Sequence, residues 1–424
     1  MFALKRTPEG SIERFKARLV ARGFEQRLGR DDSEIYAPVA HLDTVRTVLS
    51  VSAVEDFHIR QFDVSTAFLH GKIDEDIYLE PPQGIDIPSS KFLKLAKALY
   101  GLKQASRAWY KCLREQLREL GLTQAPSDAC LFRNDESTVF VLIYVDDGLI
   151  IGRDERECDK LSAKIAEIYK IKILSGKMFI GIEINWDKDK ITLSQKRYIT
   201  DMLARFNMDS AKPATCPFID LRQDSKENST ATFHGPYKEA MGSLLYLANR
   251  TRPDILYAVN YLARASHDPT EWHWTSVKRI FRYLIKTRDY CISYHRGNRY
   301  LLAYSDADWA SPITDRHSTS GVIITYGGGP ILFSYRKQTC YALSSTEAEY
   351  VAAACAARDL RWIVRLLGEL KTVHPKLTLF IDNQSTIKQI QSGEINRKRA
   401  VVKKGGVAPP PPFVTNSLFR PRRS

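Results

Sequence analysis

The sequence predicts an α+β fold followed by a second, α/β domain, and three patterns support this prediction. In the first half, the expected elements follow the order strand, helix, strand, strand, helix, which is typical of a sheet with helices on one face. Three helical segments come next, at 237–250, 254–266 and 270–286. From about residue 290 a new series of strands begins, with a hairpin and a long helix, which indicates a separate domain.

The first sheet is expected to begin with the strand HIRQFDVSTAFL at 58–69. Its alternation places Asp63 on the same side as Ile59 and Gln61. Residues 104–120 predict a helix, because apolar residues recur at helical spacing. After it come two strands around residue 146 and an amphipathic helix at about 155–170.

The segment FVLIYVDDGLIIGR (140–153) places two acids in the middle of an apolar run. One interpretation is a hairpin turn, in which Gly148 takes the positive φ that such turns need. The other is a site for divalent metal, because a hairpin tip that holds Asp146 and Asp147 together offers paired carboxylates. If the strand with Asp63 lies next to this hairpin, three carboxylates meet at one edge of the sheet. Turn chemistry alone does not decide between the two.

The second half begins with a hairpin that turns at 187–189, and a helix that starts near Gln195. Residues 212–236 form a polar connector with proline at both ends. In the last domain, a long helix is expected at 345–370, followed by the strand LTLFID and a helix from Asn383. Residues 396–424 are rich in proline and basic residues and predict a disordered tail.

Composition favours a folded protein with a polyanionic partner. Hydrophobic residues make up 44% of the 424 residues, and 63 Lys and Arg against 49 Asp and Glu give a net charge of +14. Part of this excess lies in eight basic residues of the tail: Arg397, Lys398, Arg399, Lys403, Lys404, Arg420, Arg422 and Arg423. The seven cysteines stand singly, which argues against zinc or disulfides and for a reducing compartment. With no apolar segment of membrane length, we expect a soluble intracellular protein; the sequence does not distinguish a cytoplasmic particle from the nucleus.

Several motifs in a fixed order carry a resemblance to a known family. QFDVSTAFLHGKIDEDIYLEPPQG, LYGLKQASRAWY and YVDD resemble the reverse transcriptase of copia-type LTR retrotransposons. The upstream FKARLVARGFEQRLGRD and the downstream LYLANRTRPDILYAVNYLAR resemble the fingers and thumb of that enzyme. The resemblance covers about residues 10–395. It implies a right-hand polymerase of palm, fingers and thumb, followed by an α/β ribonuclease H-like domain.

The resemblance also implies residue roles. Asp63, Asp146 and Asp147 match the metal-binding acids of the polymerase. Phe68 matches the aromatic gate that crowds the sugar 2′-position and favours deoxynucleotides, and Gln104 matches the residue that faces the incoming nucleotide. Basic finger residues that contact the triphosphate are matched by Lys16 and Arg18. A charged face of the third helical segment is a candidate for nucleic-acid binding, although such a face is usually only solvated; it contains Lys278, Arg279, Arg282 and Lys286.

A second acidic constellation lies in the last domain. In YLLAYSDADWA, Asp306 and Asp308 share one strand face, so periodicity cannot choose between them. In SSTEAEYVAAACAARDLRWIVRLL, Glu349 falls on the apolar stripe and Glu347 on the arginine-rich side. A charge on the buried stripe is unfavourable unless it is paired or metal-bound. Asp382 ends an apolar strand, at the edge where α/β sites collect.

This trio resembles that of the ribonuclease H domain in copia-type elements, where YSDADWA, SSTEAEY and DNQSTIK supply the metal ligands. The resemblance implies Asp306, Glu349 and Asp382 as ligands for two-metal hydrolysis of RNA in a hybrid. The alternative is that Asp306 and Asp382 are ordinary strand-end residues. A histidine-containing, acid-rich segment with a fourth carboxylate is expected after STIKQIQSGEINRK, and the basic tail stands there instead. We therefore expect an impaired ribonuclease.

These observations predict a piece of a Pol polyprotein in four parts: fingers and palm at 1–211, connector and thumb at 212–289, ribonuclease H-like domain at 290–395, and tail at 396–424. The expected activity is RNA-directed DNA polymerisation with Mg²⁺, or alternatively Mn²⁺. The expected partners are an RNA template, a DNA primer, an RNA–DNA hybrid and deoxynucleoside triphosphates, with no membrane; oligomeric state is not predicted. The alternative function is that of an inactive element remnant that only binds nucleic acid.

Overall fold

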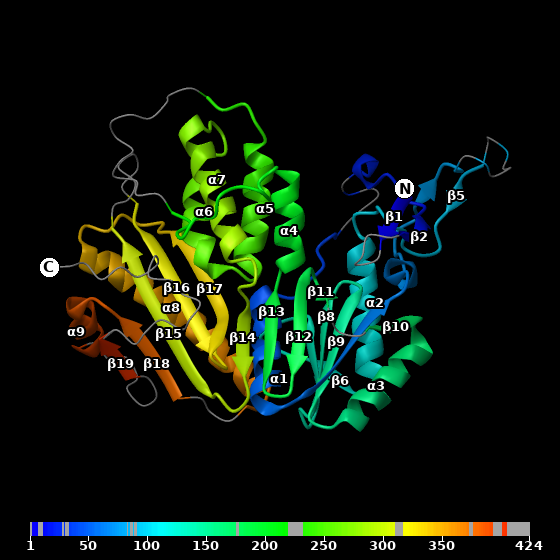
Figure 1. The fold of residues 1–424 in the computed structure, drawn as a ribbon. Coiled ribbons are helices and arrows are strands. Elements are labelled where there is room, and N and C mark those ends of the chain that lie inside the picture. The colour runs from blue at the N-terminus through cyan, green and yellow to red at the C-terminus, as the bar shows by residue number, and fades with distance from the viewer. Residues whose placement is uncertain are drawn as a thin grey trace. The chain divides into compact units, whose positions relative to one another are not determined.

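The computed structural model describes residues 2–6, 12–27, 29, 34–82, 84, 88, 91–174, 178–218, 232–309, 317–372, 376–392 and 401–404. The chain divides into two compact units, drawn in Figure 1. Unit 1 is Met1–His41 and His58–Ser175, and unit 2 is Leu42–Phe57 and Gly176–Ser424. This division groups residues 42–57 and 176–211 with the C-terminal part, a grouping that the sequence did not predict.

Unit 1 contains a six-stranded sheet in the order β10-β3-β9-β8-β7-β6 and two small hairpins. Its strands are β1 (Phe2–Arg6), β2 (Ile12–Ala17), β3 (His58–Val64), β4 (Tyr78–Leu79), β5 (Leu93–Lys94), β6 (Leu122–Gln124), β7 (Leu131–Asn134), β8 (Val139–Tyr144), β9 (Asp147–Gly152) and β10 (Ile171–Leu174). Its helices are the short η1 (Gly23–Glu25) and η2 (Ala67–His70) and the longer α2 (Ala105–Glu119) and α3 (Glu155–Ile168). The predicted order of strand, helix, strand, strand, helix is confirmed, although the first strand ends at Val64, because residues 67–70 form a 3-10 turn.

The core of unit 1 lies between its sheet and helices α2 and α3. Phe62 and Val64 of β3 join one buried cluster with Trp109 of α2 and Ile165 of α3. Because side chains alternate along a strand, Asp63 projects from the other face of the sheet. The helices therefore cover one face and leave the acidic residue on the opposite one.

Unit 2 combines a four-stranded sheet, a helical group and a five-stranded sheet (Figure 1). Its first elements are α1 (Leu42–Glu55), β11 (Met178–Phe179), β12 (Ile182–Asp187), β13 (Lys190–Ser194), α4 (Lys196–Arg205), α5 (Tyr237–Arg250), η4 (Pro253–Ile255), α6 (Leu256–Ala263), α7 (Glu271–Lys286) and β14 (Ile292–His295). The remaining elements are β15 (Tyr300–Asp308), β16 (Thr319–Tyr326), β17 (Gly329–Lys337), α8 (Ser345–Glu369), β18 (Lys376–Ile381), α9 (Gln384–Ser392) and β19 (Val401–Lys404). The helices expected at 237–250, 270–286 and 345–370 are confirmed within a residue.

Helix α1 is buried in unit 2 and was not predicted. Eleven consecutive residues, 44–54, are buried, so the helix has no polar side that would give the sequence a helical period. The Arg46 side chain donates to the carbonyls of Arg250 at 2.9 Å and Ile331 at 3.0 Å, and its guanidinium lies 4.1 Å from the centre of the Phe333 ring. Strand β3 follows three residues after this helix ends.

The five-stranded sheet has the order β17-β16-β15-β18-β19. Its first three strands are antiparallel, and β18 and β19 run parallel to β15. Strand β19 corrects the prediction of a disordered tail for four residues: Val401–Lys404 pair with Thr378–Ile381. Their two valines favour a strand, and β18 offers them a free edge. The rest of the predicted tail lies outside the described residues.

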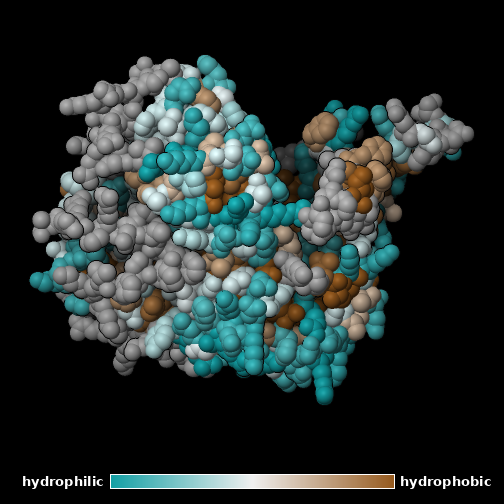
Figure 2. Space-filling model, in the orientation of Figure 1, coloured by the Kyte–Doolittle hydropathy of each residue, from teal (hydrophilic) through white to brown (hydrophobic). Residues whose placement is uncertain are grey.

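Figure 2 shows a face on which hydrophilic side chains predominate and hydrophobic ones lie in small separate groups. Among the described residues, no helix has the length and apolarity needed to cross a membrane. The seven cysteines are all free, as their single spacing predicted.

Candidate functional site

The first candidate site lies where β3 and β9 run side by side in unit 1. In their antiparallel register Asp63 stands directly opposite Asp147, and the amide of Val64 donates to the carbonyl of Asp146 at 2.8 Å. Directly opposed residues place their side chains on the same face of a sheet. The strand with Asp63 thus lies next to the hairpin, which meets the condition that the sequence left open. Among the described residues, however, the ligand oxygens of Asp63, Asp146 and Asp147 do not all lie within 4.8 Å of one another.

The turn before Asp147 differs from the prediction. Gly148 has no positive φ: it lies in β9 opposite Phe62, and a side chain there would place its Cβ 2.2 Å from the Phe62 ring. The residue with positive φ is Val145, at +61°. Glycine at 148 is thus required by close packing against Phe62, and the turn strain falls on a β-branched residue instead.

A row of three side chains lies near these acids. Phe68, on η2, packs against Tyr100 with ring centres 4.9 Å apart, and the guanidinium of Arg18 lies 5.0 Å from the centre of the same Tyr100 ring. Burial raises the pKa of Tyr100, and the negative charges of Asp146 and Asp63 raise it further, while Arg18 opposes them. Tyr100 thus lies within electrostatic reach of both acids. Sequence reasoning missed Tyr100, although it is the second residue of the quoted motif LYGLKQ.

Gln104 is the N-cap residue of α2 and is 3% exposed. Its side-chain oxygen accepts a hydrogen bond from Gln26 Nε2 at 3.0 Å. The Gln26 Oε1 in turn accepts from the amide of Lys103 at 2.9 Å, and the Lys103 ammonium donates to the Gln26 carbonyl at 2.8 Å. Gln26, which the sequence did not single out, therefore joins the segment after β2 to the start of α2.

Of the two basic finger residues that the sequence predicted, the structure describes the side chain of one. Arg18 lies beside Tyr100, whereas the side chain of Lys16 is outside what the structure describes. A further basic residue lies next to one of the acids within the sheet itself: Lys172 of β10 is directly opposite Asp63. An opposite charge at this position favours the strand pairing. The alternating segment IKIL at 171–174 could have predicted this strand and its lysine.

The second candidate site lies in unit 2, where one acid each from β15, α8 and the end of β18 meet. Asp306, Glu349 and Asp382 each offer a ligand oxygen, and these atoms all lie within 4.8 Å of one another. Among the described residues, no other three acids, histidines or cysteines approach so closely. The structure thus separates Asp306 from Asp308, a choice that periodicity left open.

Glu349 is 6% exposed while Glu347 lies at the surface, which confirms the predicted orientation of this helix. Burial raises the pKa of Glu349 to about 8 and that of Asp306 to about 6, with further increases from the neighbouring acids of the trio. Glu349 Oε1 accepts from the Ala307 amide at 3.2 Å, whereas its buried Oε2 has no hydrogen-bond partner among the described residues. A buried, unpartnered carboxylate oxygen beside two further acids fits a divalent cation.

Two of the four basic residues predicted on the nucleic-acid face of α7 bind backbone carbonyls of the chain itself. Arg279 donates to the Cys216 carbonyl at 3.1 Å, and Arg282 donates to the Lys212 carbonyl at 2.6 Å. Both arginines therefore hold the connector against α7. Lys278 is half-buried, and Lys286 is exposed at the end of the helix.

The mixed sheets and helices define an α+β chain with two acidic sites, and comparison with known proteins gives the family. Residues 1–220 match the family described as "Reverse transcriptase (RNA-dependent DNA polymerase)". The chain therefore belongs to this family.

Curated relatives extend the similarity beyond that region. The chain is 38% identical over 402 residues to the retrovirus-related Pol polyprotein from transposon TNT 1-94 of Nicotiana tabacum, which covers 91% of this chain and 30% of the relative. It is 43% identical over 377 residues to that from transposon RE1 of Arabidopsis thaliana, covering 87% of this chain and 26% of the relative. These matches confirm the resemblance to copia-type Pol polyproteins. The chain spans less than a third of the length of these two relatives.

Solved structures agree on the fold. The foamy viral protease-reverse transcriptase in complex with dsDNA is similar with a TM-score of 0.50 and 13% identity, covering 96% of this chain and 78% of that chain. A second foamy viral structure, titled protease-reverse transcriptase dRH in complex with ds DNA, gives a TM-score of 0.51 at 12% identity, covering 96% of this chain and 65% of that chain. At such identities the likeness shows the fold alone, and it confirms the predicted α+β polymerase architecture.

Proposed function

We propose that the chain is an RNA-directed DNA polymerase, with its polymerase acids in unit 1, that adds deoxynucleotides to a DNA primer on an RNA template. The observation that carries the proposal is the register of β3 and β9, which sets Asp63 opposite Asp147 with Asp146 in the adjoining turn. Membership of the reverse transcriptase family supports the same reaction.

Phosphoryl transfer demands little covalent chemistry from the protein; it depends on positioning and on stabilisation of charge. Asp63, Asp146 and Asp147 are oxygen ligands of the kind that Mg²⁺ prefers, with Mn²⁺ as the alternative. These three carboxylates would hold such ions, which would supply activation of the attacking hydroxyl and stabilisation of the leaving pyrophosphate. The carboxylates supply the negative charge that holds these ions, while the sheet hydrogen bonds fix the backbone that carries them.

The neighbouring side chains have distinct roles in this proposal. Arg18 balances the charge of the triphosphate, and its stacking on Tyr100 limits the orientations that its guanidinium adopts. Phe68 is braced by the same Tyr100 ring and excludes a 2′-hydroxyl by its bulk. Gln104 is buried and held by Gln26, and its proposed role is to shape the pocket for the nucleotide and template from beneath.

The test is primer extension by the purified chain, with a DNA primer on an RNA template and Mg²⁺. We expect incorporation that stops on addition of EDTA and returns with excess Mg²⁺ or Mn²⁺. A chain that binds the primer-template in a salt-sensitive manner but extends it with neither metal would contradict the polymerase and support a binding remnant.

A second function is favoured by the converging acids of unit 2. We propose that Asp306, Glu349 and Asp382 bind divalent metal and hydrolyse RNA in an RNA–DNA hybrid. The rate is expected to be low, because the basic, proline-rich sequence stands where the family has a fourth carboxylate.

The test uses a labelled RNA annealed to DNA, with the wild-type chain and the Asp382→Asn variant. Slow Mg²⁺-dependent cleavage that the substitution abolishes would support the proposal. Equal cleavage by both chains would contradict it.

A further inference from the structure

The turn that carries Asp146 contains a strained residue. Tyr144 pairs with Asp147, so Val145 and Asp146 form a two-residue hairpin turn, with φ of Val145 at +61°. When only the first central residue has positive φ, that position normally belongs to glycine, because a side chain there is strained. Valine, branched at Cβ, keeps such a conformation only if surrounding groups hold it.

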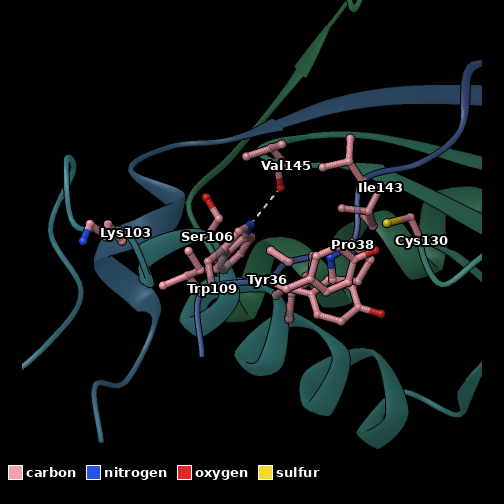
Figure 3. A pocket seen from close by; sticks show the side chains of 13 residues that line it. Tyr36, Pro38, Lys103, Ser106, Trp109, Cys130, Ile143 and Val145 are labelled. Carbon is pink, nitrogen blue, oxygen red and sulfur yellow. Dashed lines mark hydrogen bonds between the residues drawn. The ribbon is translucent and has the colours of Figure 1, made fainter. Parts of the chain in front are cut away.

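Two consecutive carbonyls of this turn have defined partners. The Asp146 carbonyl accepts from the Val64 amide at 2.8 Å, next to Asp63 in strand β3. The Val145 carbonyl accepts from the indole Nε1 of Trp109 at 2.7 Å, the bond drawn as a dashed line in Figure 3. The second bond fixes the plane of the peptide between Val145 and Asp146. That plane helps to set the direction in which the Asp146 side chain projects.

The indole is well placed for this role, because its own position is tightly restrained. Trp109 is 1% exposed and meets the Tyr169 ring nearly edge-on, with ring centres 5.1 Å apart. Its backbone lies against Gly71, where an added Cβ would come within 2.7 Å of the Trp109 nitrogen. Helix α2 and the loop after η2 therefore seat the tryptophan at one place beneath the turn.

A cavity lies beside the turn on the side where the indole of Trp109 contacts it. Trp109 and Val145 both line a cavity of about 420 Å³, together with Ile143, Ser106, Tyr36 and further residues of unit 1. Figure 3 shows the indole reaching the Val145 carbonyl at this cavity. With open space beside Val145, the hydrogen bond is the specific restraint on its conformation from that side.

We infer that Trp109 is a positioning residue for Asp146, acting through the Val145 carbonyl. The inference rests on the proposed polymerase function, and it assigns the Trp109 N–H a role beyond filling the core. A buried tryptophan N–H commonly finds some acceptor. Here the acceptor belongs to the strained residue that immediately precedes a proposed metal ligand.

The first test compares the wild type with Trp109→Phe, which keeps an aromatic ring and removes the N–H. We expect kcat for single-nucleotide incorporation to fall by about tenfold or more, because a small misplacement of a reacting group is sufficient for such a loss. KM for the nucleotide and affinity for primer-template should change far less. The matched control is Tyr110→Phe, which lies on the same helix and lines the same cavity but loses a 2.7 Å bond to the Ala129 carbonyl instead of one to the turn. Unchanged kcat in Trp109→Phe, or an equal loss in Tyr110→Phe, would overturn the inference.

The second test is a double-mutant cycle with Val145→Gly. Glycine adopts positive φ without strain, so the turn should depend less on the indole. Trp109→Phe should then lower kcat much less in the Val145→Gly background than in the wild type. A loss of the same size in both backgrounds would mean that the tryptophan contributes packing alone, and would contradict the inference.

A separate readout distinguishes this inference from the polymerase proposal. The indole proton of Trp109, assigned by its disappearance in Trp109→Phe, should exchange slowly with solvent in the wild-type chain. If no variant extends primers but this proton is protected, the polymerase proposal fails while the contact with the turn stands. Rapid exchange in the folded wild type would contradict the contact itself.

Discussion

The two acidic sites differ in how closely the structure brings their carboxylates together. In unit 1, sheet register sets Asp63 opposite Asp147, on the face away from helices α2 and α3. In unit 2, a buried helical residue, Glu349, meets Asp306 and Asp382 with ligand atoms within 4.8 Å. The first site is defined by backbone register, whereas in the second a buried Glu349 lies beside a half-buried Asp306 and an exposed Asp382.

The largest expected effect is the loss of polymerisation in Asp63→Asn. Removing one carboxylate from the charge that stabilises the transition state should lower the extension rate by about 10³-fold. Asp306→Asn should leave extension within about twofold, because its carboxylate belongs to the other site. Steady-state extension with both variants measures this. An equal loss of extension in Asp63→Asn and Asp306→Asn would contradict the claim that the two sites act independently.

A smaller effect is expected for the sugar gate. Phe68→Val removes the bulk that Tyr100 braces, so incorporation of ribonucleotides relative to deoxynucleotides should rise by about 10- to 10²-fold. The ratio of kcat/KM for the two nucleotides is the measurement, and hybrid cleavage by unit 2 serves as the internal control. An unchanged ratio would remove Phe68 from the proposed site.

The burial of Glu349, together with repulsion from Asp306 and Asp382, predicts a pH effect on the stability of the metal-free chain. Because the pKa of Glu349 rises from 4.5 to about 8 in the folded chain, folding favours its protonated form. Stability of the metal-free chain should therefore fall as pH rises from about 4.5 to about 8. Glu349→Gln should raise stability by about 1 kcal/mol or more at pH 8 and have little effect at pH 4.

Thermal unfolding in EDTA at both pH values tests this prediction. Adding Mg²⁺ at pH 8 should stabilise the wild type by favouring the folded, metal-bound form, and should stabilise Glu349→Gln less. The matched control is Glu347→Gln, a surface change on the same helix turn. Destabilisation by Glu349→Gln at pH 8 would contradict the account of repulsion.

The smallest effects concern charges outside either acidic site. Lys286→Ala removes an exposed cation and should weaken primer-template binding while lowering its salt slope by about 1. Arg282→Ala removes the bond to the Lys212 carbonyl and should reduce stability by about 1 kcal/mol. Primer-template affinity measured across a salt series, together with thermal unfolding of each variant, distinguishes a loss of binding from a loss of stability. A large loss of affinity in Arg282→Ala without destabilisation would make this arginine a nucleic-acid contact.

Patterns with a clear period were predictable from the sequence. Helix α5 at Tyr237–Arg250 and the inward placement of Glu349 follow from helical spacing. The strands that carry Asp63 and Asp147 are neighbours, a pairing that the sequence left open. Each of these depends on local periodicity or on a single pairing.

Other features depend on contacts between residues distant in sequence. Helix α1 has no polar side because unit 2 surrounds it, so it lacks a period. Gly148 suggested a turn residue. It is instead a strand residue that must lack a side chain, because the Phe62 ring of the neighbouring strand packs against it. The support that Trp109 gives to Val145 links a helix to a hairpin 36 residues away, and spacing alone does not reveal such a bond.

The most direct test of the central claim is single-nucleotide extension by Asp146→Asn on an RNA template with Mg²⁺. Asp135→Asn is the matched control, because it changes an exposed acid in the turn at the opposite end of β8. We predict that Asp146→Asn binds primer-template as the wild type does but fails to extend it, while Asp135→Asn extends normally. Extension by Asp146→Asn at the wild-type rate would contradict the assignment of polymerisation to this hairpin.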